Sequence, residues 1–410
     1  AGSLSTGFAG IEAIRRELED FKDSGKFIVS YGDYYTQGAY YLCSVADSVF
    51  LNPQGSVSLV GLASQGLFFT GLAEKIGVEH YIFKVGTYKS AVEPFFLKKF
   101  SDANREQLTS FLGSVWGNLT TAIEKSRNIS SDELDRYLNE GLAMGQASNA
   151  VDYKLADGLR YRYEVENCVK EMAGQDVKGK LKTAGVDKIV SIKVKEKENK
   201  NKIAVLYAEG EIRDEDSSSP FSADEQVISE EMANKLRKLK DDDDVKAVVF
   251  RVNSPGGSAY ISEQIWKEVV ELKAKKPIVV SMGNYAASGG YYISCAANKI
   301  VAERTTLTGS IGVFGVVRNF TGTFDKVGVT TDIVKTNTFA DLGDISRPMR
   351  EDEKALIQRG VEQTYDLFLT RCADGRGMTK AEIDSIGQGR VWTGEQALER
   401  GLVDQLGGMD

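Results

Sequence analysis

Apolar runs of strand length alternate with stretches of helical periodicity along the second half of the chain. Such alternation predicts a mainly parallel sheet that is covered by helices, which is an α/β fold. The predicted strands are 203–207, 245–252, 277–282 and 300–302, and the predicted helices are 262–273 and 288–297.

The chain also matches itself when it is shifted by 251 residues. Residues 27–89 pair without a gap with residues 278–340, and 18 of the 63 positions are identical, against roughly one in sixteen expected by chance. A period this long indicates a duplicated domain, because solenoid repeats are much shorter. We therefore predict repeats at 1–185 and 203–410, joined by a linker at 186–202.

The first repeat begins late by the same offset. Gly2 falls opposite Asn253, so the first repeat has no counterpart of two strands expected in the second. We expect the natural protein to have further residues before Ala1, which could include a membrane anchor. The chain itself contains no run of about 18 apolar residues.

Composition excludes several classes of site. A formal charge of -8 argues against nucleic acid as the main partner, because phosphate binding needs a basic surface. The four cysteines form no CxxC pair, so neither a zinc site nor a disulfide framework is encoded. His80 is the single histidine, which excludes multi-histidine metal sites. We expect His80 to be a surface or structural residue, and the run Asp241–Asp244 to be a solvated turn.

Two glycine-rich loops in the second repeat could carry chemistry. Asn253–Ser258, NSPGGS, follows an apolar strand, and its paired glycines could present N–H groups as an oxyanion site requires. A plain strand-to-helix turn fits that loop about as well. Tyr285–Tyr291, YAASGGY, places Ser288 at the start of a helix. Taken alone, Ser288 would be read as a helix-capping serine.

Comparison of the repeats changes that balance. The first repeat has Gln37 at the position of Ser288, although the neighbouring tyrosines and glycine are kept. Conversely, Lys89 in the first repeat corresponds to Ala340 in the second. Complementary differences at a serine and a lysine are typical of one shared catalytic dyad. Two unrelated changes in diverged duplicates remain an alternative.

Four segments together resemble the signal peptide peptidase A family in its long, duplicated form, also called protease IV. They are NSPGGS, ASGGYY, TLTGSIGV at 306–313 and GTYKSAVEPF at 86–95. The resemblance covers nearly the whole chain and implies two tandem domains of the ClpP/crotonase fold. It also implies a serine protease at the bacterial cytoplasmic membrane, facing the periplasm, that degrades cleaved signal peptides.

The resemblance also implies roles for individual residues. Ser288 would be the nucleophile and Lys89, from the other domain, the general base. Gly257 and Gly289 would supply the oxyanion N–H groups, and Ser310 would hydrogen-bond the lysine. The family further implies a homo-oligomer, expected to be a tetramer, hydrophobic peptide substrates, no nucleic acid partner, and no metal or organic cofactor. Membrane association would use a segment that this chain does not contain.

A serine–lysine site makes one physical demand. Lysine accepts a proton only when it is neutral, so the site must lower the lysine pKa by about 2 to 4 units from its value in water. Burial in an apolar pocket does this, and the dyad must therefore be buried. Two other functions stay open from the residues alone: a crotonase-like acyl-CoA enzyme and a non-catalytic scaffold that binds peptides.

Overall fold

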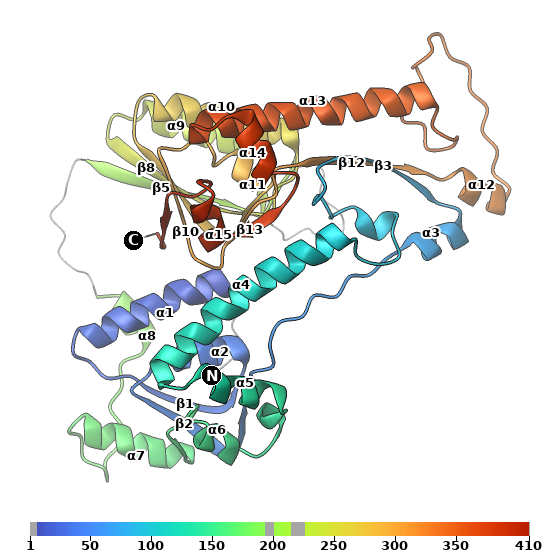
Figure 1. Ribbon diagram of the computed structural model, residues 1–410. Coiled ribbons are helices and arrows are strands. Elements are labelled where there is room, and N and C mark those ends of the chain that lie inside the picture. Colours follow the sequence, from blue (N-terminus) through green and yellow to red (C-terminus); the bar gives the residue numbers. More distant parts are fainter. Residues whose placement is uncertain (1–5, 193–200, 215–225, 410) are drawn as a thin grey trace. The chain divides into compact units, whose positions relative to one another are not determined.

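The computed structural model describes residues 6–192, 201–214 and 226–409 and divides into two compact units (Figure 1). Unit 1 contains the described parts of 1–62 and 114–201, and unit 2 those of 63–113 and 202–410. Residues 63–113 of the first repeat thus pack into the unit formed by the second, so compact units and predicted repeats have different boundaries. In the predicted linker, residues 193–200 lie outside the described residues and Val186–Val190 forms the short helix α8.

Unit 1 is built on a parallel sheet with strand order β1-β2-β4. Its strands are β1 (Val29–Tyr35), β2 (Ser48–Val57) and β4 (Gly158–Leu159). Its helices, together with α4, which crosses the unit boundary in sequence, are α1 (Phe8–Asp23), α2 (Gln37–Cys43), α4 (Asp102–Arg127), α5 (Ser131–Asn139), the 3₁₀ turn η2 (Leu142–Met144), α6 (Ser148–Asp152) and α7 (Arg162–Met172).

Unit 2 contains a seven-stranded sheet in which only the β11–β13 pair is antiparallel. Its strands are β5 (Lys202–Glu209), β8 (Val245–Ser254), β9 (Ile278–Ala287), β10 (Lys299–Ala302), β11 (Leu307–Gly309), β13 (Val391–Thr393) and β14 (Gln405–Leu406). Two smaller sheets join β3 (Glu79–Val85) to β12 (Val313–Asn319) and β6 (Glu211–Ile212) to β7 (Val227–Ile228).

The helices of unit 2 pack around this sheet or carry its connections. They are α3 (Thr70–Ile76), the 3₁₀ turn η1 (Glu93–Phe95), α9 (Glu231–Asp241), α10 (Ala259–Lys273), α11 (Gly289–Tyr292), α12 (Thr321–Val327), α13 (Glu351–Arg376), α14 (Lys380–Ile386) and α15 (Gly394–Glu399). The α/β fold with mainly parallel sheets is confirmed. The predicted helix at 288–297 is shorter than expected, because α11 ends at Tyr292.

The core of unit 2 forms where the apolar strands meet the helices above them. Alternate residues of β8, including Val248 and Phe250, are fully buried, as are Ile265 and Val269 on the inner face of α10. The start of α10 is fixed by Ser258, whose side chain accepts a hydrogen bond from the Ile261 N–H. Helices α9 and α10 lie along one side of this sheet (Figure 1). The loop between β8 and α10 is therefore held rigidly at both ends.

The two repeats use the same internal hydrogen bonds. The Tyr40 hydroxyl donates to the Leu155 carbonyl, and its counterpart Tyr291 donates to Leu402. The Asp157 carboxylate accepts from a β2 N–H and pairs with Arg127, while Asp404 accepts from a β10 N–H and pairs with Arg376. Strand order β1-β2-β4 matches β9-β10-β14. The sequence repeat is thus also a structural repeat.

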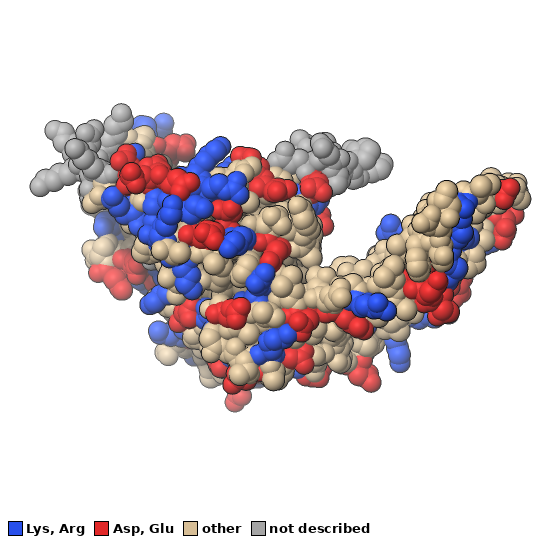
Figure 2. Space-filling model, turned by 90° about the horizontal axis from the view of Figure 1, so that it is seen from above, with Lys and Arg blue, Asp and Glu red and all other residues tan. Residues whose placement is uncertain are grey.

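The charged groups of the α9 region form a mixed surface. Blue and red side chains are interspersed over the part of this face where α9 and α10 lie (Figure 2). The run predicted as a solvated turn is exposed, with Asp241 paired to Lys275 and Asp244 to Lys202.

Across the described parts of the chain, none of the helices combines the length and the apolar character that a membrane span needs.

Candidate active site

The turn after β9 holds Ser288 in an unusual backbone conformation. Its φ of +54° lies in a region that residues other than glycine rarely occupy. Two hydrogen bonds hold it there: its N–H donates to the Gly309 carbonyl at 2.9 Å, and its carbonyl accepts from the Tyr292 N–H at 2.9 Å. Ser288 stands at the start of α11, but its side chain makes no capping hydrogen bond. Helix capping therefore does not explain this serine.

Lys89 lies beside Ser288 in the same chain. Lys89 Nζ is 3.1 Å from Ser288 Oγ, and it is 3.0 Å from both the carbonyl oxygen and the Oγ of Ser310. Only 4% of Lys89 is exposed. All three residues belong to unit 2, because residues 63–113 pack within it. The structure thus brings together the serine and the lysine that differ between the repeats.

Burial alone lowers the pKa of the Lys89 amine from 10.5 to about 7. A neutral amine has two N–H donors and one lone pair. The Ser310 carbonyl can only accept, so it takes one N–H, and Ser310 Oγ can take the other. The lone pair is then left for the Ser288 hydroxyl, which donates to it. These contacts match an uncharged lysine that is ready to remove the serine proton.

The turn at Asn253–Ser258 lies next to the Ser288 turn. Gly257 forms a bridge with Ile212, in which the neighbouring Gly256 carbonyl and Ser258 N–H make the bonds. This pattern turns the Gly257 N–H away from Ile212. Among the residues that the structure describes, no acceptor is found for the N–H of Gly257 or of Gly289. Two backbone donors are therefore available close to Ser288.

Gly256 keeps this space open. Its φ is +101°, and a Cβ added there would lie 2.6 Å from the Gly289 nitrogen and 2.8 Å from Ser288 Cβ. Any side chain at this position would cover the Gly289 N–H and press on the serine. Glycine is thus required here both by the backbone conformation and by the close approach of the two turns.

Several residues that the sequence analysis did not identify hold Lys89 in place. The loop at 86–90 is fixed by Gln107, whose side chain donates to the Tyr88 carbonyl and to Ser90 Oγ and accepts from the Val391 N–H. The Tyr88 N–H donates to the Gln388 carbonyl. At Gly389, an added Cβ would lie 2.6 Å from Lys89 Cβ. The lysine stem therefore packs directly against a glycine backbone.

The first repeat has a glutamine in place of the serine. Gln37, at the position of Ser288, accepts hydrogen bonds through its side-chain oxygen from the Val60 and Gly61 N–H groups. This amide cannot serve as a nucleophile. The difference noted in the sequence thus corresponds to a real change in hydrogen bonding.

The contacts of His80 are with residues other than Ser288 and Lys89. His80 lies in β3, stacks on Phe95 with ring centroids 5.1 Å apart, and is paired with Arg318 on the neighbouring strand β12. Partial burial and the Arg318 charge lower its pKa. We expect His80→Gln to keep at least about half of the wild-type kcat/KM on a peptide substrate, because neither contact reaches the dyad. A loss of about 100-fold or more would show that His80 takes part in the reaction.

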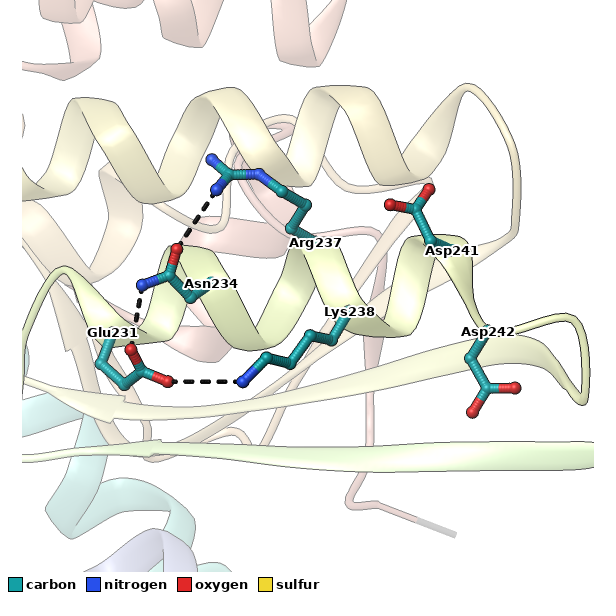
Figure 3. Close-up of a pocket in the computed structure, with 6 residues that line it drawn as sticks. All are labelled: Glu231, Asn234, Arg237, Lys238, Asp241 and Asp242. Carbon is teal, nitrogen blue, oxygen red and sulfur yellow. Dashed lines mark hydrogen bonds and ion pairs between the residues drawn. The ribbon is translucent and has the colours of Figure 1, made fainter.

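A surface depression on α9 offers no comparable chemistry (Figure 3). Four of its six lining side chains interact with one another: Arg237 donates to Asn234, Asn234 donates to Glu231, and Lys238 lies 4.0 Å from Glu231. Among the described residues, no group of three or more His, Cys, Asp or Glu side chains is placed to hold a metal ion.

Comparison with known proteins agrees with this fold. Residues 219–311, within the second repeat, match the Clp protease family model, in keeping with the α/β fold that the structure shows there. Residues 20–176 and 270–410 match the model of peptidase family S49. The chain belongs to peptidase family S49. The family resemblance predicted from the four sequence segments is thereby confirmed.

Curated relatives extend beyond this chain. Protease 4 of Haemophilus influenzae is 38% identical over 97% of this chain and 65% of its own length. Protease 4 of Salmonella typhi is 39% identical over 97% of this chain and 64% of its own length. A serine protease SPPA, chloroplastic, of Arabidopsis thaliana is 34% identical over 99% of this chain and 60% of its own length. The chain thus spans less than two thirds of these relatives.

Proposed function

We propose that this chain is a serine endopeptidase that uses Ser288 as the nucleophile and Lys89 as the general base. One observation carries the proposal: a lysine with a pKa of about 7 lies 3.1 Å from the hydroxyl of a strained serine. A serine hydroxyl is a weak nucleophile and needs such a base beside it. Membership of peptidase family S49 supports the same reaction class.

The reaction then follows from the geometry. Neutral Lys89 Nζ takes the hydroxyl proton as Ser288 Oγ attacks the peptide carbonyl carbon. The oxygen that gains negative charge accepts hydrogen bonds from the Gly257 and Gly289 N–H groups. Lys89 next gives its proton to the leaving amine, which breaks the C–N bond and leaves an ester on Ser288. It then removes a proton from water as the water oxygen attacks the ester carbonyl carbon, and it returns that proton to Ser288 Oγ as the bond between this carbon and Oγ breaks.

Ser310 has a positioning role in this scheme. It accepts both N–H groups of Lys89 and so directs the lone pair toward Ser288. Its own backbone has a φ of +51° and is held by a hydrogen bond from its N–H to the Arg390 carbonyl. The lysine is thus oriented as well as desolvated.

Substrate and location are proposed by analogy with the relatives. We infer extended, hydrophobic peptides with small residues near the cut, namely signal peptides left after cleavage, as substrates. From the resemblance to the signal peptide peptidase A family we also propose a homo-oligomeric bacterial protease at the cytoplasmic membrane with its site facing the periplasm, and we expect a tetramer.

A fluorophosphonate probe tests the proposed nucleophile. We expect labelling of a single serine, identified by peptide mass spectrometry as Ser288, together with hydrolysis of an unstructured apolar peptide. Absence of labelling at Ser288, combined with a rise in Tm on addition of coenzyme A, would instead indicate an acyl-CoA enzyme. Absence of labelling with unhydrolysed but bound peptide would indicate a scaffold.

The rate of labelling should depend on pH in one direction. Because only neutral Lys89 can act as a base, the rate should rise about tenfold per pH unit below 7 and level off above it. A stopped assay from pH 5 to 9 gives this profile. A rate that stays constant across pH 6 to 8 would contradict the assignment of Lys89.

A further inference from the structure

The β3–β12 ribbon joins one strand from each repeat. The two strands are antiparallel, with Val85 opposite Val313 and Glu79 opposite Asn319. Each strand of the ribbon adjoins the site in sequence: β3 leads into the loop that carries Lys89, and β12 begins shortly after Ser310. One face of the ribbon packs on α13, around Phe83 and Val361.

The repeat implies a second ribbon of the same kind. Shifted by 251 residues, β12 corresponds to residues 62–68 and β3 corresponds to residues 330–336. The elements in between are kept in both repeats: α3 and α12 each have seven residues and end at a left-handed glycine, Gly77 or Gly328. Yet neither 62–68 nor 330–336 forms a strand. Each repeat thus contains one segment of the formed β3–β12 ribbon and one segment, 62–68 or 330–336, of a second ribbon that is not formed within the chain.

Residues 62–68 and 330–336 have properties expected of strands that are not paired. Residues 330–336 read TTDIVKT, a sequence rich in β-branched residues, but every one of them is exposed. Val334 is 98% exposed and Leu67, in the other segment, is 67% exposed. The arm of unit 2 that bears α12 shows tan areas between its blue and red side chains in Figure 2. Exposed apolar side chains that lie close together, such as those of residues 330–336, are typical of an interaction surface.

We propose that residues 330–336 of one chain pair with residues 62–68 of a second copy. The pairing would be antiparallel in the register of the existing ribbon, so that Ser64 lies opposite Val334 just as Gly315 lies opposite Phe83. The contact joins two different segments, so it is head-to-tail. After one contact has formed, the first copy still has its segment 62–68 available and the second copy still has its segment 330–336 available. Repeated contacts of this kind close into a ring when the rotation allows it.

The same offset predicts what this contact contains. In the existing ribbon, β3 delivers Lys89 to Ser288. In the second ribbon, the corresponding positions are Ala340 of one chain and Gln37 of its neighbour. Neither residue can act as a base or as a nucleophile. The contact is therefore an assembly surface without a second catalytic centre, and it does not depend on the proposed peptidase activity.

Cysteine cross-linking tests the partner and the register together. In a background with Cys43→Ser and Cys168→Ser, Ser64→Cys and Val334→Cys are made in separate chains, mixed and oxidised. We expect a covalent dimer on a non-reducing gel. The matched control pairs Ser64→Cys with Ile333→Cys, which shifts the register by one residue and turns that side chain to the other face. We expect its yield to be at least about fivefold lower.

Two results would overturn the proposal. One is the absence of dimer from the in-register mixture. The other is a double variant, Ser64→Cys with Val334→Cys, that closes only within its own chain. Light scattering gives a second measurement: Val334→Asp should lower the oligomer mass, whereas Val190→Asp, at a site with 79% exposure outside the arm, should not. A mass unchanged by Val334→Asp would also contradict the proposal. All three readouts are independent of peptidase activity.

Discussion

Lys89→Met should abolish activity and at the same time make the protein more stable near pH 7. Methionine fills the same space but offers no base, so we expect kcat/KM to fall by about 10⁴-fold and fluorophosphonate labelling of Ser288 to disappear. The thioether side chain carries no charge at any pH, so its burial does not require the loss of a proton. Activity and stability should therefore change in opposite directions.

The sign of the stability change follows from the lysine pKa. Folding lowers this pKa from 10.5 to about 7, so between these pH values the unfolded chain binds a proton that the folded chain does not. Near pH 7 the difference costs the wild type about 4 kcal/mol. The hydrogen bonds lost at Ser310 offset about 1–3 kcal/mol of that gain in the variant. We thus expect a higher Tm for Lys89→Met.

A pH series separates this effect from better packing. The extra stability of Lys89→Met should shrink as pH rises from 7 towards 10.5, because the wild type then no longer forgoes a proton on folding. Calorimetry at several pH values measures it. A variant that is less stable than the wild type at pH 7, or a stability difference independent of pH, would show that Lys89 is charged in the folded state.

Gly389→Ala should nearly abolish activity through the position of the lysine. The added Cβ would lie 2.6 Å from Lys89 Cβ and 2.6 Å from its backbone nitrogen. Because backbone cannot move away as a side-chain tip can, the loop carrying Lys89 must shift. A displacement of about 1 Å at a catalytic group costs on the order of 100-fold in rate. We expect a loss of that size in kcat/KM.

Gly377→Ala is the matched control. Gly377 has a similar φ, +66° against +78°, and an added Cβ there would meet nothing within 4 Å. Both variants pay the strain of a left-handed alanine, about 1–2 kcal/mol, but only Gly389→Ala pushes on Lys89. Thermal unfolding and peptide hydrolysis of both proteins check this. Equal loss of activity in the two variants would attribute the effect to strain alone.

The sequence predicted the fold class, and it also identified Ser288 and Lys89 as the residues that meet at the site. A duplicated chain contains its own comparison, and the exchange of Ser288 for Gln37 and of Lys89 for Ala340 needed no knowledge of packing. Buried strands such as β8 also leave an unmistakable apolar run. The roles of Ser288, Lys89, Gly257, Gly289 and Ser310 in catalysis stay predictions for the experiments above.

The support around the lysine could not be predicted in the same way. Gln107 and Gly389 are far from Lys89 in sequence, and a glutamine or a glycine in a loop has no distinctive pattern. Only the packed backbone shows that Gln107 fixes Tyr88 and Ser90. The sequence also did not predict that residues 63–113 belong to unit 2. The internal repeat shows where the duplicated segments begin and end, but it does not show which strands pair with one another.

The separation of the two dyad residues along the chain also has a temporal meaning. Lys89 is made 199 residues before Ser288. At about 5–20 residues per second, the ribosome needs roughly 10–40 s to cover that distance. During that interval the growing polypeptide contains the proposed general base without the proposed nucleophile. Under the proposed mechanism, the growing polypeptide therefore has no serine–lysine pair until the segment that carries Ser288 has been made and folded.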